Sequence, residues 1–170
     1  FSGSITARGT SDGAGGFVET SSLNNIQLFG SVDASGGTIG EWLIDPSDVT
    51  VTDTNSQSFG NLFEPAADSA TVAASSIISA LATQNVTIDT HNPSGSDVGT
   101  ITITDALTNI NANGTALILV ASEDVIINNS ITSSGGALSI SINAQGNVKV
   151  QNNADITTKG GFFKVAGSND

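Results

Sequence analysis

The chain has 170 residues and a formal net charge of −12, from 4 basic and 16 acidic residues. Four basic side chains are too few to neutralise a phosphate backbone or to bind an anionic lipid surface. We therefore expect neither nucleic-acid binding nor docking on a membrane. No apolar run approaches the roughly 20 residues that span a bilayer, so we expect no membrane insertion. With no cysteine and one histidine, the chain also has almost no material for a zinc site.

The first fifty residues predict a series of short strands, "GSITARG", "GGFVETS", "NIQLFGSVDAS" and "GEWLIDP". A strand with a leading glycine and an aromatic residue occurs twice, with Phe17 and Trp42 separated by 25 residues. If equivalent strands stack in parallel, Phe17 and Trp42 should point inward as neighbours on consecutive coils. The glycine-rich stretch at 8–16 lacks the Lys-Ser/Thr ending of a phosphate loop, and we interpret it as a turn.

Residues 53–84 interrupt the strand pattern and predict an insertion. Ala73, Ile77 and Leu81 stand at helical spacing. We therefore expect a loop followed by one amphipathic helix over 69–83, packed on the side of the coil. Asp68 or Ser69 can serve as its N-cap.

The C-terminal third repeats itself. Residues 114–135 and 136–160 are two copies of one pattern, and "GFFKVAG" begins a third. Leu117, Leu138 and Phe162, separated by 21 and 24 residues, are expected to be equivalent and to lie on parallel strands. A repeat of about 20–25 residues with three short strands is typical of a solenoid coil, and crossovers between parallel strands are right-handed. The sequence therefore predicts an all-β, right-handed parallel β-helix over 1–170 as a single segment.

The corner residues of these copies suggest an asparagine ladder. Asn128-Asn129 and Asn152-Asn153 occupy matching corners, where side-chain amides can bond along the stack. Three Asn-x-Ser/Thr sequons are also present, at Asn85, Asn113 and Asn128.

The one histidine does not predict catalysis. His91 stands in a turn near Pro93, with Asp89 and Asp97 as its nearest acids. A histidine in such a loop is more often an exposed turn residue than a general base. We expect no catalytic residue.

Two acidic stretches each place two acids close together, as a calcium site requires. "DPSD" at 45–48 and "SEDV" at 122–125 match neither the EF-hand spacing nor the nonapeptide calcium coil. Asp45 is better explained as a cap of the turn before Pro46. We expect no metal and no cofactor.

The order "GGFVETS", "VDASGG", "WLIDPSDVTV", "IISALATQNVTI" and "LILVASEDVIINNSITSSGGALSISINAQGNV" resembles the filamentous haemagglutinin family over nearly the whole chain. These are large bacterial exoproteins exported by two-partner secretion. The resemblance implies a parallel β-helix, an extracellular or cell-surface location and a role in adhesion or surface fibres. The segment lacks the amino-terminal secretion domain and starts at Phe1, so we expect a section of a longer fibre.

The leading functional hypothesis is a non-catalytic structural or adhesive module of a secreted fibre. Its expected partners are neighbouring coils of a longer chain or identical subunits end to end, with surface glycans or proteins as further candidates. One alternative is a self-assembling extracellular filament subunit. Another alternative is a carbohydrate-active or carbohydrate-binding β-helix protein. Two observations argue against an enzyme: the acids do not recur at coil spacing, and the basic residues are scattered along the chain (Arg8, Lys149, Lys159 and Lys164).

Overall fold

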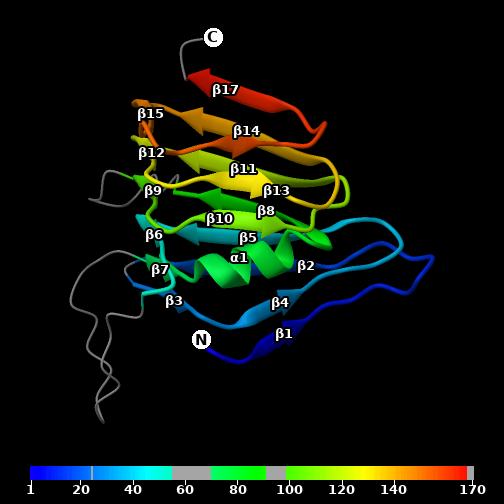
Figure 1. Cartoon of the computed structure of the whole chain (residues 1–170). Coiled ribbons are helices and arrows are strands. Elements are labelled where there is room, and N and C mark those ends of the chain that lie inside the picture. The colour runs from blue at the N-terminus through cyan, green and yellow to red at the C-terminus, as the bar shows by residue number, and fades with distance from the viewer. Residues whose placement is uncertain (24, 55–69, 91–98, 168–170) are drawn as a thin grey trace.

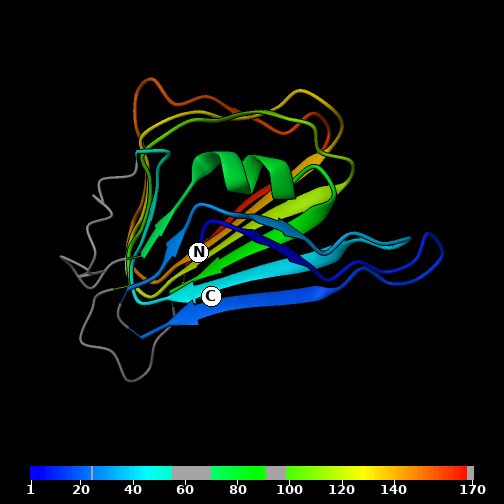
Figure 2. The same ribbon diagram turned by 90° about the horizontal axis from the view of Figure 1, so that it is seen from below.

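The computed structural model of the chain describes residues 1–23, 25–54, 70–90 and 99–167. Every pair of adjacent strands in this part is parallel, and the sheets form the three sides of a solenoid. The chain winds clockwise as it recedes from the viewer in Figure 2, so the coil is right-handed, with the N-terminus at one end and the C-terminus at the other (Figure 1). The predicted fold class is confirmed.

The first side is a six-stranded sheet built from the longest strands, in the order β17-β14-β11-β8-β5-β2. In the strands over 115–121 and 138–144, buried side chains alternate with more exposed ones, which is the period of two expected for a strand with one buried face. The strands are β2 (Phe17–Ser22), β5 (Gly40–Pro46), β8 (Gln84–Asp89), β11 (Thr115–Ala121), β14 (Leu138–Ala144) and β17 (Phe163–Gly167).

The second side is a six-stranded sheet of shorter strands, in the order β15-β12-β9-β6-β7-β3. β7 follows β6 in the chain but lies between β6 and β3, so the chain steps back by one strand here before it advances again. The strands are β3 (Gln27–Leu28), β6 (Val49–Val51), β7 (Ala70–Val72), β9 (Ile101–Ile103), β12 (Val125–Ile127) and β15 (Val148–Val150).

The third side is divided by a helix. One sheet pairs β1 (Ser4–Thr6) with β4 (Ser31–Asp33), and the other has the order β10-β13-β16. Between them lies α1 (Ala74–Ala80), which contacts both β4 and β10. The remaining strands are β10 (Leu107–Ile110), β13 (Ile131–Ser133) and β16 (Ile156–Thr157).

The helix lies where the cross-section of the solenoid changes from narrow to wide. In Figure 2, β1 and β4 run close to the first sheet, whereas the coils nearer the C-terminus extend further out, and α1 lies between these two outlines. Its Ile77 is fully buried, as is Leu81 just beyond it. The helix therefore covers the interior of the wide coils where the narrow coils do not reach.

Stacked apolar columns form the core. Trp42, Val86, Leu117 and Ile140 lie opposite one another on four consecutive strands of the first sheet, and each is 0% exposed. Because like positions stack at about 4.8 Å, one buried column runs through the molecule without interruption. The parallel pairing of the C-terminal repeats is confirmed, although Leu117 lies opposite Ile140 rather than Leu138.

The expected inward pair of Phe17 and Trp42 is wrong. Val18 lies opposite Trp42, whereas Phe17 lies opposite Glu41 and is 58% exposed. A shift of one residue moves a side chain to the other face of a sheet, so the spacing that matters here is that from Val18 to Trp42 (42 − 18 = 24). A Cβ on Gly40 would clash with the carbonyl oxygens of Ala34 and Gly16, so the strand needs a glycine before the buried tryptophan.

The predicted helix exists but is shorter than expected. Asp68 and Ser69 lie outside the described residues, and the N-cap is Ala73, so the expected cap is wrong. The residues before it, Ala70–Val72, form β7, because Thr71 and Val72 pair with strands on both sides. Ala73 offers no side-chain cap. Asp53 accepts hydrogen bonds from the Ser75 N–H (2.9 Å) and the Ser75 hydroxyl (2.8 Å), which satisfies the first turn from a distant part of the chain.

Candidate functional site

Three core-facing side chains are exposed in the last described coil at the C-terminal end of the solenoid. Phe163, Val165 and Val150, which we call the C-terminal end face, are 47%, 49% and 44% exposed. In the preceding coil, the residues opposite them are Ile140, Ile142 and Ile127, respectively, and each of these is 0% exposed. Among the described residues, no further coil covers these core positions, and β15, β16 and β17 each pair on one edge only.

The N-terminal end differs from the C-terminal end. Val18, Leu28 and Val32 lie in the outermost coils at this end, yet they are only 7%, 0% and 6% exposed. The narrow cross-section formed by β1 and β4 leaves little interior to cover (Figure 2). The two ends therefore present different surfaces.

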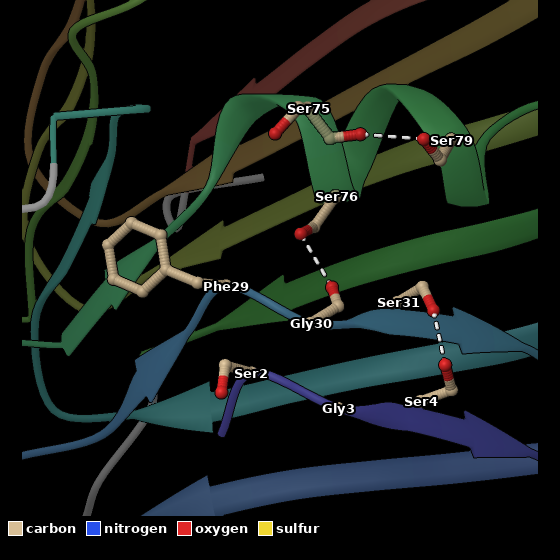
Figure 3. Close-up of a pocket in the computed structure, with 9 residues that line it drawn as sticks. All are labelled: Ser2, Gly3, Ser4, Phe29, Gly30, Ser31, Ser75, Ser76 and Ser79. Atoms are coloured by element: carbon tan, nitrogen blue, oxygen red, sulfur yellow. Dashed lines mark hydrogen bonds between the residues drawn. The ribbon is translucent and has the colours of Figure 1, made fainter.

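A serine-lined cleft lies between α1 and the strands β1 and β4. It has a volume of about 370 Å³, and Figure 3 shows Ser75 and Ser79 on the helix across from Ser4 and Ser31 on the strands. Phe29 and two glycines complete the lining, which contains no charged side chain. The six serines that line this cleft are Ser2, Ser4, Ser31, Ser75, Ser76 and Ser79.

Asp124, from the second acidic stretch, connects two coils. Its Oδ1 accepts hydrogen bonds from the Asn147 N–H (2.7 Å) and the Asn147 side-chain amide (3.1 Å), and its Oδ2 lies 2.5 Å from Lys149 Nζ. The hydrogen bond from Lys149 and the backbone N–H of Asn147 lower the pKa of Asp124 to about 2, against a smaller opposing effect of burial. A Cβ on Gly146 would come within 2.5 Å of Asp124 Oδ1, so a glycine permits this approach.

The first acidic stretch also makes structural contacts. Asp48 Oδ1 accepts a hydrogen bond of 2.6 Å from the Thr100 N–H, which ties β6 to the segment before β9. Asp45 is half-buried in β5, opposite Ser21 on the neighbouring strand β2.

The remaining acid–histidine group is only partly described. His91, Pro93 and Asp97 lie outside the described residues, and Asp89 is half-buried at the end of β8. Within the described ranges, no three His, Cys, Asp or Glu side chains are placed to hold a metal ion.

Asn129 bonds along the stack, but not to another asparagine. Its Nδ2 donates a hydrogen bond of 2.8 Å to the Thr104 carbonyl oxygen in the preceding coil. Asn152 and Asn153 are exposed. The side chain of Asn129 thus bonds to a backbone carbonyl oxygen in a turn. This hydrogen bond is not one between the stacked asparagine side chains of a ladder.

The three sequons differ in accessibility. Asn113 is exposed in the turn before Gly114, whereas Asn85 and Asn128 are half-buried. Asn85 Oδ1 also accepts a hydrogen bond of 2.8 Å from the Ala116 N–H in the next coil. Asn113 is therefore the sequon with the most accessible side chain.

Two of the features above gave no local signal in the sequence. The cleft combines residues from 2 to 79, and isolated serines are too common in this chain to stand out. The cap that Asp53 provides to Ser75 spans 22 residues and depends on β7 stepping back under β6. Neither could be read from neighbouring residues.

These features define a parallel β-solenoid with an open apolar end and a neutral polar cleft. The described part of the chain contains no helix with the length and apolar character needed to cross a membrane. No family model matches the chain, and no curated protein matches it.

Proposed function

We propose that the protein is a non-catalytic structural module of a secreted bacterial surface fibre, similar to those of the filamentous haemagglutinin family. Its coils form one stretch of a rigid rod, and the rod holds adhesive surfaces away from the cell. The resemblance in sequence described above and the parallel β-solenoid support this proposal.

The observation that carries the proposal is the C-terminal end face. The residues opposite Phe163, Val165 and Val150 on the preceding coil are fully buried, whereas these three side chains are each about half exposed. Covering each of them would contribute on the order of 1 kcal/mol, and the free edge of β17 offers backbone hydrogen bonds to a further parallel strand. Such an end is suited to the next coil of a rod.

The use of the acids supports a structural rather than a catalytic role. Asp48, Asp53 and Asp124 each accept a hydrogen bond from a backbone N–H distant in the sequence. A carboxylate engaged in this way holds one part of the coil to another. A catalytic acid, by contrast, must have its carboxyl group within hydrogen-bond reach of the substrate atom with which it exchanges a proton.

A filament of identical subunits is the second candidate function, because the same end face could pair with another copy. Head-to-tail stacking would place the wide C-terminal end, with Phe163 and Val150, against the narrow N-terminal end, where Val18 is already buried. The mismatch in cross-section favours a further coil of matching width over a head-to-tail polymer.

Surface labelling tests the proposal. Antibodies raised against the purified protein should label intact cells of the source bacterium, and brief protease treatment of those cells should remove the label. Permeabilised cells are the control for total antigen. Labelling that requires permeabilisation and survives protease would show that the fibre proposal is wrong.

A further inference from the structure

The serine-lined cleft has a fixed floor. Ser76 is buried and its hydroxyl donates a hydrogen bond of 2.6 Å to the Gly30 carbonyl oxygen, which fastens α1 to the segment before β4 (Figure 3). Beside it, the Ser31 N–H donates a hydrogen bond of 3.0 Å to the Gly3 carbonyl oxygen. Both walls are therefore held in place, and a ligand would not have to order them.

The walls carry hydroxyl groups with unused bonding capacity. Ser79 donates to the Ser75 carbonyl oxygen (2.8 Å) and Ser31 donates to Ser4 Oγ (3.1 Å). Ser75, Ser79, Ser4 and Ser31 are all exposed, and a hydroxyl group that donates one hydrogen bond can still accept others through its oxygen. The cleft can thus bond to several hydroxyl groups of a ligand.

The charge around the cleft selects against anions. Its lining has no charged side chain, the Asp53 carboxylate lies next to Ser75, and the chain has a net charge of −12. A phosphate, sulfate or carboxylate ligand would meet no cationic side chain in the lining and would be repelled at longer range by the net negative charge.

The shape and the one aromatic side chain favour a sugar ring. The cleft has a volume of about 370 Å³ and is shallow and largely open to solvent, so it would hold one ring of a ligand rather than enclose a whole molecule. Phe29 lies at one end of the cleft and is half-buried, and its ring is the one aromatic side chain in the lining. Hydroxyl partners together with one apolar surface match the chemistry of a neutral saccharide.

We propose that the serine-lined cleft binds a terminal sugar of a neutral glycan. The proposal deepens the proposed function and rests on it, since a glycan ligand gives the fibre its adhesive contact. The cleft lies on the third side of the solenoid, and none of its lining residues belongs to the C-terminal end face. Its test can therefore fail without affecting the rod.

The test is a titration of the whole 170-residue protein with neutral oligosaccharides ending in glucose, galactose, mannose or N-acetylglucosamine, followed by calorimetry and ligand-observed NMR. One of these probes should bind with millimolar affinity. Ser79→Ala and Ser31→Ala should each weaken that binding about fivefold, the effect of one net hydrogen bond. Ser79→Gln should weaken it more than tenfold, because a longer neutral side chain fills the cleft.

Ser21→Ala is the matched control, since Ser21 is an exposed serine on β2, and it should leave affinity unchanged. All four variants alter exposed residues, and unchanged thermal unfolding would confirm that they fold. The proposal is overturned if no neutral probe binds with a Kd below about 10 mM, if binding is unaffected by the three cleft variants, or if a sulfated or sialylated oligosaccharide binds more tightly. Surface labelling of cells remains informative in each case, so failure of the sugar site and failure of the fibre are distinguishable.

Discussion

The indole nitrogen of Trp42 donates a hydrogen bond of 3.1 Å to Thr20 Oγ1 on the preceding coil. Trp42 is 0% exposed, so this bond gives the one polar atom of the side chain a partner inside the stack. Val18, two residues before Thr20, lies opposite Trp42 in the strand register. The tryptophan therefore joins the outermost strand of the first sheet to the buried column by packing and by a hydrogen bond.

Trp42→Ala should destabilise the protein by about 3–5 kcal/mol, because the change leaves a large cavity in the column and removes the hydrogen bond from the indole to Thr20 Oγ1. Urea unfolding followed by far-ultraviolet circular dichroism measures the change. Phe17→Ala is the matched control: Phe17 is 58% exposed on the outer face of the same pair of strands, so its loss should cost less than about 1 kcal/mol. Equal losses for the two variants would contradict the register.

Asp53→Ala should destabilise the protein by about 0.5–2 kcal/mol, the usual effect of removing an N-cap side chain. The helix depends on this residue because Ala73 provides no side-chain bond, whereas Asp53 accepts from both the N–H and the hydroxyl of Ser75. Asp53→Asn should cost less, since an amide oxygen still accepts but carries no charge for the helix dipole. Thermal unfolding measures both variants.

Asp12→Ala serves as the control for this experiment, since Asp12 is an exposed acid in a turn far from the helix. It should leave stability within about 0.5 kcal/mol of the parent. A destabilisation by Asp12→Ala as large as that by Asp53→Ala would assign the effect to net charge rather than to capping.

Acid should weaken the contact between the coils that contain Asp124 and Asn147. The pKa of Asp124 in the folded protein is lowered from 3.8 to about 2, so the folded state favours the ionised form. A lowered pKa contributes stability that is fully present above the unfolded pKa and is lost as the pH falls through the folded one. The loss attributable to this carboxyl should therefore fall between about pH 4 and about pH 2.

Urea midpoints measured from about pH 5 to about pH 2 test this expectation. Asp124→Asn keeps an oxygen for the Asn147 N–H but cannot ionise, so it should be less stable than the parent near pH 5, and this difference should shrink towards pH 2. The lowered pKa of Asp33, which comes first from its hydrogen bond with Ser35, acts in the same direction in both proteins and cancels in the comparison. A difference that does not change with pH would contradict the role assigned to Asp124.

The sequence predicted the strands and their parallel stacking because alternation with a period of two and small-residue turns are local signals. The register failed at Phe17 because two aromatic residues were aligned by type, whereas the interior selects side chains by face and places Val18 against Trp42. Ala70–Val72 resembled the start of a helix, and only pairing with β3 and β6 makes it a strand. The cleft depends on coils of different width, which no single stretch of sequence encodes.

The C-terminal end face should be the least stable part of the solenoid, because no further coil among the described residues covers it. The backbone of β17 is paired on one edge, and the side chains of Phe163 and Val165 are covered on one side only. Local stability follows buried contacts, so the amides of β17 should exchange with deuterium much faster than those of β8 and β11. Native-state hydrogen exchange with mass spectrometry resolves these strands.

Addition of one further coil should reverse this difference. Because Phe163 lies opposite Ile140, residues 145–167 make one full coil, and a second copy of them placed after Gly167 should stack on the end face. Exchange of the original β17 should then slow to the rate of β14, since the added strand covers its free edge and its apolar side chains. The matched control carries the same added coil with the copies of Val148, Val150, Ile156, Phe163 and Val165 changed to serine, and exchange of the original β17 should stay as fast as in the parent. Fast exchange in both extended proteins, or strong protection of β17 in the unextended one, would show that this end is not built to accept another coil.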